Sequence, residues 1–145
     1  MPSIIKTDAD IRDILRGLVD LTLPKSNWTH EAHLAAAVAI INDENFDALN
    51  DMPRIIKAYN LATGVKNTDH SGYHHTITVA SLLAIQAHMK NDFSRLSEAF
   101  SKLVQSEYGR STWLLTYWSK DLLFSVKARK RWVAPDLRTL PFRSS

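Results

Sequence analysis

The sequence predicts an all-α fold, a single-domain bundle of about six helices that spans residues 1–145 and ends in an extended tail. Three observations predict it. Apolar residues recur at helical spacing in several segments, no segment alternates apolar and polar residues as a half-buried strand would, and the chain has only 4 glycines. A chain of 145 residues is long enough for one domain with a hydrophobic core.

Two helices are predicted in the first third of the chain. The first starts at Thr7 or Asp8, whose side-chain oxygens suit a helix N-cap, and ends before Pro24. The second has Thr29 as its N-cap, and its residues 34–41 are apolar all round, which predicts a helix in the middle of the fold. One apolar stripe at i, i+3, i+4, i+7 and i+8 marks the first helix: Ile11, Ile14, Leu15, Leu18 and Val19.

The middle of the chain predicts two helices separated by a polar loop. Asp51 suits an N-cap with Pro53 in the first turn, and Gly64 suits the position after the last turn. Residues 65–72 form the most polar stretch and have no helical period, which predicts an irregular loop. A fourth helix is expected over about residues 73–89.

The last third predicts shorter elements. A fifth helix, capped by Asp92 or Ser94, is expected to place Phe93 on its apolar side. A Trp- and Leu-rich segment opens at residue 111 or 112, and Ser125 caps a final helix that ends near residue 132. The tail contains two prolines and is expected to dock by its three large apolar residues, Leu137, Leu140 and Phe142.

Composition limits the chemistry. The chain has no cysteine, which excludes disulfides, thiolate nucleophiles and cysteine-ligated metals. No signal-like start and no apolar run of membrane-spanning length occurs, so we expect a cytoplasmic protein that does not enter a membrane. The net charge of +3 is concentrated in residues 120–145, which we interpret as a solvated face rather than a nucleic-acid footprint.

Two histidines at the predicted start of the second helix indicate a functional site. His30 and His33 are three residues apart and so share a helix face. The positive end of the helix dipole disfavours a charged imidazolium there, and the neutral form can ligate a metal or act as a general base. With His74, they would form a three-histidine set for a divalent metal such as zinc, while Asp69 in place of His74 would suit ferrous iron.

Further residues are expected around the same pocket. Tyr73 is predicted to join the three histidines in acid–base chemistry. Five residues are predicted to bind or orient a substrate: Trp28, Tyr59, Asn67, Asp69 and Thr78. Three interpretations stay open: an acid–base or metal-dependent enzyme acting on a small organic molecule, a non-catalytic small-molecule or metal-binding protein, and a homodimeric interaction module with structural histidines.

These motifs resemble a family of small bacterial helical proteins that carry Trp-Thr-His-x-x-His-Leu and Gly-Tyr-His-x-Thr-Ile-Thr. Here the motifs are residues 28–34 and 72–78, and the resemblance continues through Leu123-Phe124-Ser125 to the Pro-Asp-Leu-Arg stretch at residues 135–138. The resemblance implies that the two motifs belong to one site, but it brings no activity. The family has an acidic residue where this chain has His75, so His75 is not expected to be a primary ligand.

Overall fold

Ten helical segments and no strand are formed within residues 5–142, the part of the chain described by the structure, which is a computed structural model. The predicted all-α fold is confirmed. The N-terminal stretch used to judge a secretory signal lies largely outside these residues. In chain order the helices are α1 (Asp8–Val19), η1 (Lys25–Asn27), α2 (His30–Ile41), α3 (Ala48–Ala62), α4 (His75–His88), α5 (Leu96–Gln105), η2 (Glu107–Gly109), η3 (Ser111–Thr116), α6 (Lys120–Leu123) and α7 (Val126–Lys130), where η denotes a 3₁₀-helix.

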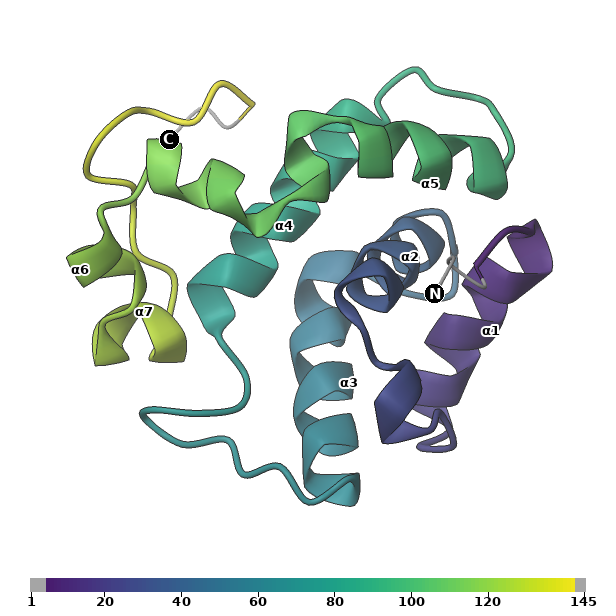
Figure 1. Cartoon of the computed structure of the whole chain (residues 1–145), viewed down its shortest axis with the longest axis horizontal. Helices are drawn as coiled ribbons and strands as arrows, with labels where there is room; N and C mark the ends of the chain where they lie inside the picture. Colours follow the sequence, from purple (N-terminus) through teal and green to yellow (C-terminus); the bar gives the residue numbers. More distant parts are fainter. Residues whose placement is uncertain (1–4, 143–145) are drawn as a thin grey trace.

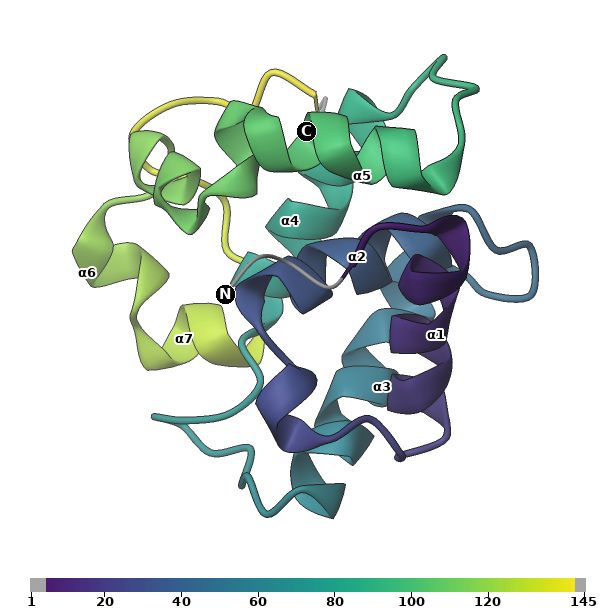
Figure 2. The same ribbon diagram turned by 45° about the vertical axis from the view of Figure 1, so that its right-hand side comes forward.

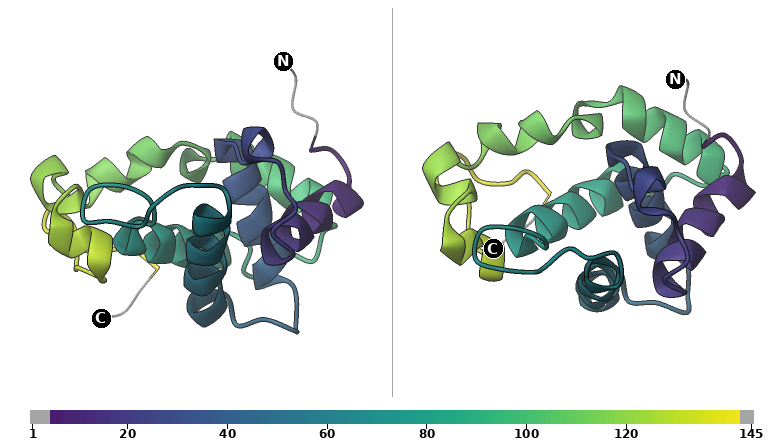
Figure 3. Two further views of the ribbon diagram at one scale, coloured as in Figure 1. Left: turned by 90° about the horizontal axis from the view of Figure 1, so that it is seen from below. Right: turned by 60° about the horizontal axis from the view of Figure 1, so that its bottom comes forward.

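Helix α4 lies in the middle of the molecule and separates two hydrophobic cores. Figure 1 shows α1, α2 and α3 on one side of α4, and α6, α7 and the C-terminal tail on the other. The larger core joins α1, α2, α3 and α5 to one face of α4. The smaller core packs Trp113 and Trp118 of the later segments against Ala80 and Ala84 on the other face. Two further views show these two groups at opposite ends of an elongated molecule (Figure 3).

The starts of α1 and α2 agree with the sequence predictions. Thr7 caps α1 through a complete capping box, in which its hydroxyl accepts from the Asp10 N–H at 3.0 Å and the Asp10 carboxylate accepts from the Thr7 N–H at 3.0 Å. Thr29 caps α2 by accepting from the Ala32 N–H at 3.2 Å. Residues 34–40 of α2 are all buried, as an apolar helix without a polar face requires.

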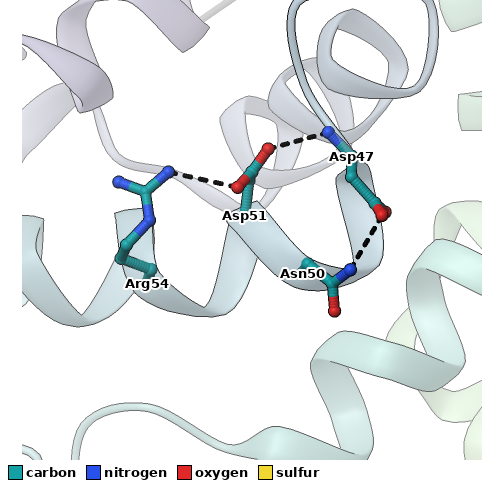
Figure 4. Close-up of polar contacts among 4 residues, drawn as sticks. All are labelled: Asp47, Asn50, Asp51 and Arg54. Atoms are coloured by element: carbon teal, nitrogen blue, oxygen red, sulfur yellow. Dashed lines mark hydrogen bonds and ion pairs between the residues drawn. The ribbon is translucent and has the colours of Figure 1, made fainter.

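Helix α3 begins one turn earlier than its proline signal predicts. Its N-cap is Asp47, not Asp51, and Pro53 lies inside the helix. Figure 4 shows the reason: the Asp51 carboxylate accepts the backbone N–H of Asp47 at 2.7 Å, and Asn50 Nδ2 donates to the Asp47 carboxylate at 2.8 Å. Arg54 also pairs with Asp51 at 3.2 Å, and this polar cluster holds the extra turn.

Of three further helix boundaries, the end of α3 agrees with the prediction and the starts of α4 and α5 do not. Gly64 follows the end of α3 with φ +84°, the left-handed conformation expected after a helix C-terminus. Helix α4 starts at His75, so His74 is its N-cap and not part of its first turn. Helix α5 starts at Leu96 with Arg95 as N-cap, and Phe93 is 94% exposed in the preceding turn, so its predicted place on the apolar face was wrong.

The C-terminal part folds around the second face of α4. Ser125 caps α7 as predicted, and the separate short helix α6 was not anticipated. Leu140 is buried and Phe142 packs against the smaller core, whereas Leu137 is 55% exposed, so only part of the predicted docking occurs. Within residues 5–142 no helix is long and apolar enough to cross a membrane.

Candidate functional site

A cavity of about 320 Å³ lies where α2, α3 and α4 meet the segment formed by η2 and η3. We call it the His33 cavity. In Figure 2 the segment between α5 and α6, drawn in green, lies above the start of α2. The exposed residues that line the cavity include His30, His33 and Ser111, which mark its mouth. Its buried lining residues are apolar: Leu34, Ala37, Met52, Leu82, Ala84, Ile85, Trp113 and Leu114.

Trp28 and His33 form one wall of the mouth as a stacked pair. Their ring centroids are 3.6 Å apart and their planes differ by 21°. Tyr59 supports this wall from behind, with its ring edge-on to Trp28 at 5.8 Å and its hydroxyl donating to the Leu23 carbonyl at 2.7 Å. Tyr59 is fully buried and does not line the cavity, so its place is behind the pocket wall rather than against a ligand.

Backbone carbonyl partners fix which nitrogen of each mouth histidine carries the proton. His33 Nδ1 lies 2.7 Å from the Thr29 carbonyl oxygen, and His30 Nε2 lies 2.8 Å from the Gly109 carbonyl oxygen. A carbonyl oxygen can only accept, so each of these nitrogens is the donor. In the neutral ring the other nitrogen, Nε2 of His33 and Nδ1 of His30, keeps a lone pair. No hydrogen bond from residues 5–142 occupies either lone pair.

The pKa of His33 is lowered from its ordinary value of 6.5. The largest cause is burial of the imidazole, because Trp28 covers one face of the ring. The residue as a whole keeps solvent contact. The hydrogen bond to Thr29 opposes this shift, and repulsion from His30 adds to it. The neutral form of His33 therefore predominates at pH 7, with burial of the ring as the largest cause.

His74 is held at a structural position away from the mouth. Its Nε2 donates to the Leu123 carbonyl at 2.7 Å, and its Nδ1 accepts from the Ile77 N–H at 3.1 Å, which caps α4. Burial is the largest cause that lowers the pKa of His74. With both ring nitrogens engaged, the neutral imidazole has no lone pair left for a metal or a substrate.

The predicted three-histidine metal set is not assembled. Within residues 5–142, no three His, Cys, Asp or Glu side chains lie together in a group that could hold a metal ion. His74 is occupied by Leu123 and Ile77, and Asp69 forms an exposed ion pair with Lys130 at 2.9 Å. The physical reason is that residues 67–74 pack toward α3, α6 and α7, so neither third ligand accompanies His30 and His33.

The other predicted residues of the second motif hold the polar loop in place. Asn67 Oδ1 accepts from the Tyr73 N–H and from Asn60 Nδ2, each at 3.0 Å, and Asn67 Nδ2 donates to the Lys57 carbonyl at 3.1 Å. Tyr73 is buried, and its hydroxyl lies 2.8 Å from His75 Nδ1. Burial raises the pKa of Tyr73 to about 12, so it is a poor proton donor at neutral pH.

Thr78 is the one predicted residue of the second motif that reaches the His33 cavity. It lines the cavity from the first turn of α4, where its hydroxyl donates to the His74 carbonyl at 2.8 Å. The structure thus brings together Trp28, His30, His33 and Thr78. It leaves Asn67, Asp69, Tyr73 and His74 outside the cavity, in the connection between α3 and α4.

Several lining residues were not anticipated from the sequence. Ser81 continues the polar line of Thr78 along α4, while Tyr108, Ser111 and Trp113 come from the η2–η3 segment. Tyr108 meets Trp113 edge-on at 5.1 Å. The available signal was the aromatic content of residues 108–118. No family model, no curated protein and no solved structure matches the chain.

Proposed function

We propose that this protein binds a small, mainly apolar organic molecule in the His33 cavity. The observation that supports this proposal most is the shape of the cavity. It has an apolar floor below a mouth that contains two histidines, and the cavity as a whole has a volume of about 320 Å³. Small-molecule sites are typically concave, mostly apolar and supplied with a few convergent polar groups, and volumes of about 300–1,000 Å³ are usual for them.

His33 is the residue proposed to orient the ligand. Its Nε2 carries the free lone pair of a neutral imidazole, and the Thr29 hydrogen bond and the Trp28 stack hold the ring. A ligand hydroxyl or N–H that displaces water from this nitrogen would gain a hydrogen bond in a partly dehydrated place.

Binding is favoured over turnover. A neutral imidazole with a free lone pair is suited to general-base catalysis, which is the specific observation in favour of an enzyme. The described cavity lining, however, contains no carboxylate, lysine or arginine to stabilise charge that develops on a substrate. Cytoplasmic location, homodimerisation and the resemblance to small bacterial proteins remain predictions, and light scattering after size-exclusion chromatography tests the second.

Ligand-observed NMR with toluene, cyclohexanol and indole tests the proposal. Saturation transfer from the protein to at least one probe is expected, and it should disappear in Ser81→Phe, which fills the cavity from α4. Ser101→Phe makes the same chemical change on an exposed face of α5, outside the lining residues, and should keep the signal. Absence of transfer to all three probes, or equal transfer in Ser81→Phe, would overturn the proposal.

A further inference from the structure

The polar atoms at the cavity mouth select for a hydrogen-bond donor. His30 and His33 each give their ring proton to a backbone carbonyl, at 2.8 and 2.7 Å, so in the neutral state each offers only an acceptor nitrogen. Four hydroxyls also line the cavity and do not discriminate, because a hydroxyl can accept as well as donate: those of Thr78, Ser81, Tyr108 and Ser111. A ligand group that only accepts would therefore find no partner on either neutral imidazole.

The charges at the cavity select for an uncharged ligand. Among the described residues that line it there is no Asp, Glu, Lys or Arg. An ionised group taken from water into such a site has no partner of opposite charge, and unpaired burial of charge is costly. The lowered pKa of His33 further disfavours an imidazolium that could pair with an anion at neutral pH.

The walls and the volume select for a flat molecule of two fused rings. Trp28, Tyr108 and Trp113 line the cavity, and aromatic side chains pack well against the faces and edges of another aromatic ring. A cavity of about 150 Å³ is known to hold one benzene. The His33 cavity has a volume of about 320 Å³, roughly twice that, which suits a two-ring system.

We infer that the ligand is an uncharged, fused two-ring aromatic molecule that carries one N–H or O–H donor, which it gives to His33 Nε2. This inference rests on the proposed function and specifies its ligand class. Indole has the required shape and donor, benzofuran has nearly the same shape without a donor, and indole-2-carboxylate adds a negative charge.

Calorimetric titration at pH 7.5 with these three probes tests the inference. Indole is expected to bind about three- to tenfold more tightly than benzofuran, the effect of one net hydrogen bond. Indole-2-carboxylate should bind more weakly than both. In His33→Phe, which retains an aromatic ring against Trp28 but has no acceptor, the ratio of the indole and benzofuran affinities should fall to about one. His33→Gln, whose amide oxygen can accept, should restore part of the preference.

The outcomes separate a wrong ligand class from a wrong function. Equal affinity of indole and benzofuran, or an indole preference that survives in His33→Phe, overturns the donor assignment. Tightest binding by the carboxylate overturns the charge assignment. In both cases loss of binding in Ser81→Phe would leave the cavity as the binding site. If none of the probes binds, or if binding is the same in Ser81→Phe, both the inference and the proposed function fail.

Discussion

His33 and His74 each donate a ring proton to a backbone carbonyl, yet they have opposite roles. The second nitrogen of His33 is left with a free lone pair at a cavity mouth, whereas that of His74 accepts the Ile77 N–H and caps α4. Both residues have lowered pKa values because burial disfavours the charged imidazolium. A perturbed pKa therefore does not by itself distinguish a functional histidine from a structural one, and the hydrogen-bond partners do.

The lowered pKa values of His33, His74 and His75 lead to a prediction of how the free energy of unfolding depends on pH. Burial lowers the folded-state pKa of His33, His74 and His75 below the ordinary value of 6.5. Below about pH 6.5 the unfolded chain then binds more protons than the folded one, so the stability present at pH 7.5 is lost as the pH falls toward the lowered values. The midpoint of thermal unfolding, followed by circular dichroism, should decrease between pH 7.5 and pH 5.

A variant series assigns this slope to particular residues. His74→Asn keeps a side-chain acceptor for the α4 N-terminus but removes one titrating group, so its midpoint should fall less steeply with pH. As a control, His70→Ala removes an exposed loop histidine whose hydrogen bond to the Thr68 hydroxyl comes from its backbone N–H, and its midpoint at pH 7.5 should stay close to that of the parent protein. An unchanged slope in His74→Asn would contradict the role of His74 burial.

At the scale of elements, the loop at residues 65–72, which connects α3 to α4, is held in place by internal hydrogen bonds. Asn67 accepts hydrogen bonds from the Asn60 side chain and from the Tyr73 N–H. Arg129 of α7 donates to the Gly72 carbonyl at 3.0 Å. The polar composition of the loop, which suggested a ligand site, serves these internal contacts. Gly72 has φ +81°, and a Cβ there would meet the Lys66 carbonyl and Asn67 Oδ1, the latter at 2.8 Å.

Two glycines with the same backbone conformation predict different costs on substitution. Gly64→Ala places a Cβ in open space at φ +84°, so it should cost only the left-handed conformation, about 1–2 kcal/mol. Gly72→Ala adds a collision with the loop backbone and should lower the free energy of unfolding clearly further. Urea denaturation of both variants measures the difference, and equal losses would show that the loop around Gly72 rearranges freely.

At the scale of the whole molecule, a buried polar residue attaches the C-terminal segment to α4. Thr76 is fully buried, and its hydroxyl donates to the Arg131 carbonyl at 2.7 Å and accepts from the Val133 N–H at 3.1 Å. Trp118 Nε1 also donates to the Val133 carbonyl at 3.0 Å. These bonds attach the segment after α7 to α4, and thereby fix the smaller core from which Trp113 extends to the His33 cavity.

Thr76 variants test this attachment. Thr76→Val keeps the side-chain shape but removes the partner of the Arg131 carbonyl and of the buried Val133 N–H, which should lower the free energy of unfolding by about 1–3 kcal/mol. Thr76→Ser keeps both hydrogen bonds and loses one methyl group, for about 1 kcal/mol. Urea denaturation gives both values. If Thr76→Ser proves the more damaging change, methyl packing and not the hydroxyl holds the tail.

Local signals were sufficient for most of the fold. The Thr7 and Thr29 caps, the apolar run of α2 and the glycine after α3 each act within a few residues, so they can be recognised in the chain. The start of α3 and the position of Phe93 could not be recognised in this way, because they depend on which of several competing residues caps the helix. For the candidate site, the first motif was found, but of the site residues predicted in the second motif only Thr78 lines the cavity, beside Ile77, which was not predicted.

The sequence by itself determined an all-α chain with a capped helix start that presents Trp28, His30 and His33, since helical period and caps depend on neighbouring residues. Only the tertiary structure decided which distant residues meet them. Packing around α4 turned His74 toward Leu123 and brought Tyr108 and Trp113 to the mouth histidines. No spacing rule fixes such contacts, because they depend on how separate helices pack, and a metal set expected from spacing is therefore replaced by an apolar cavity.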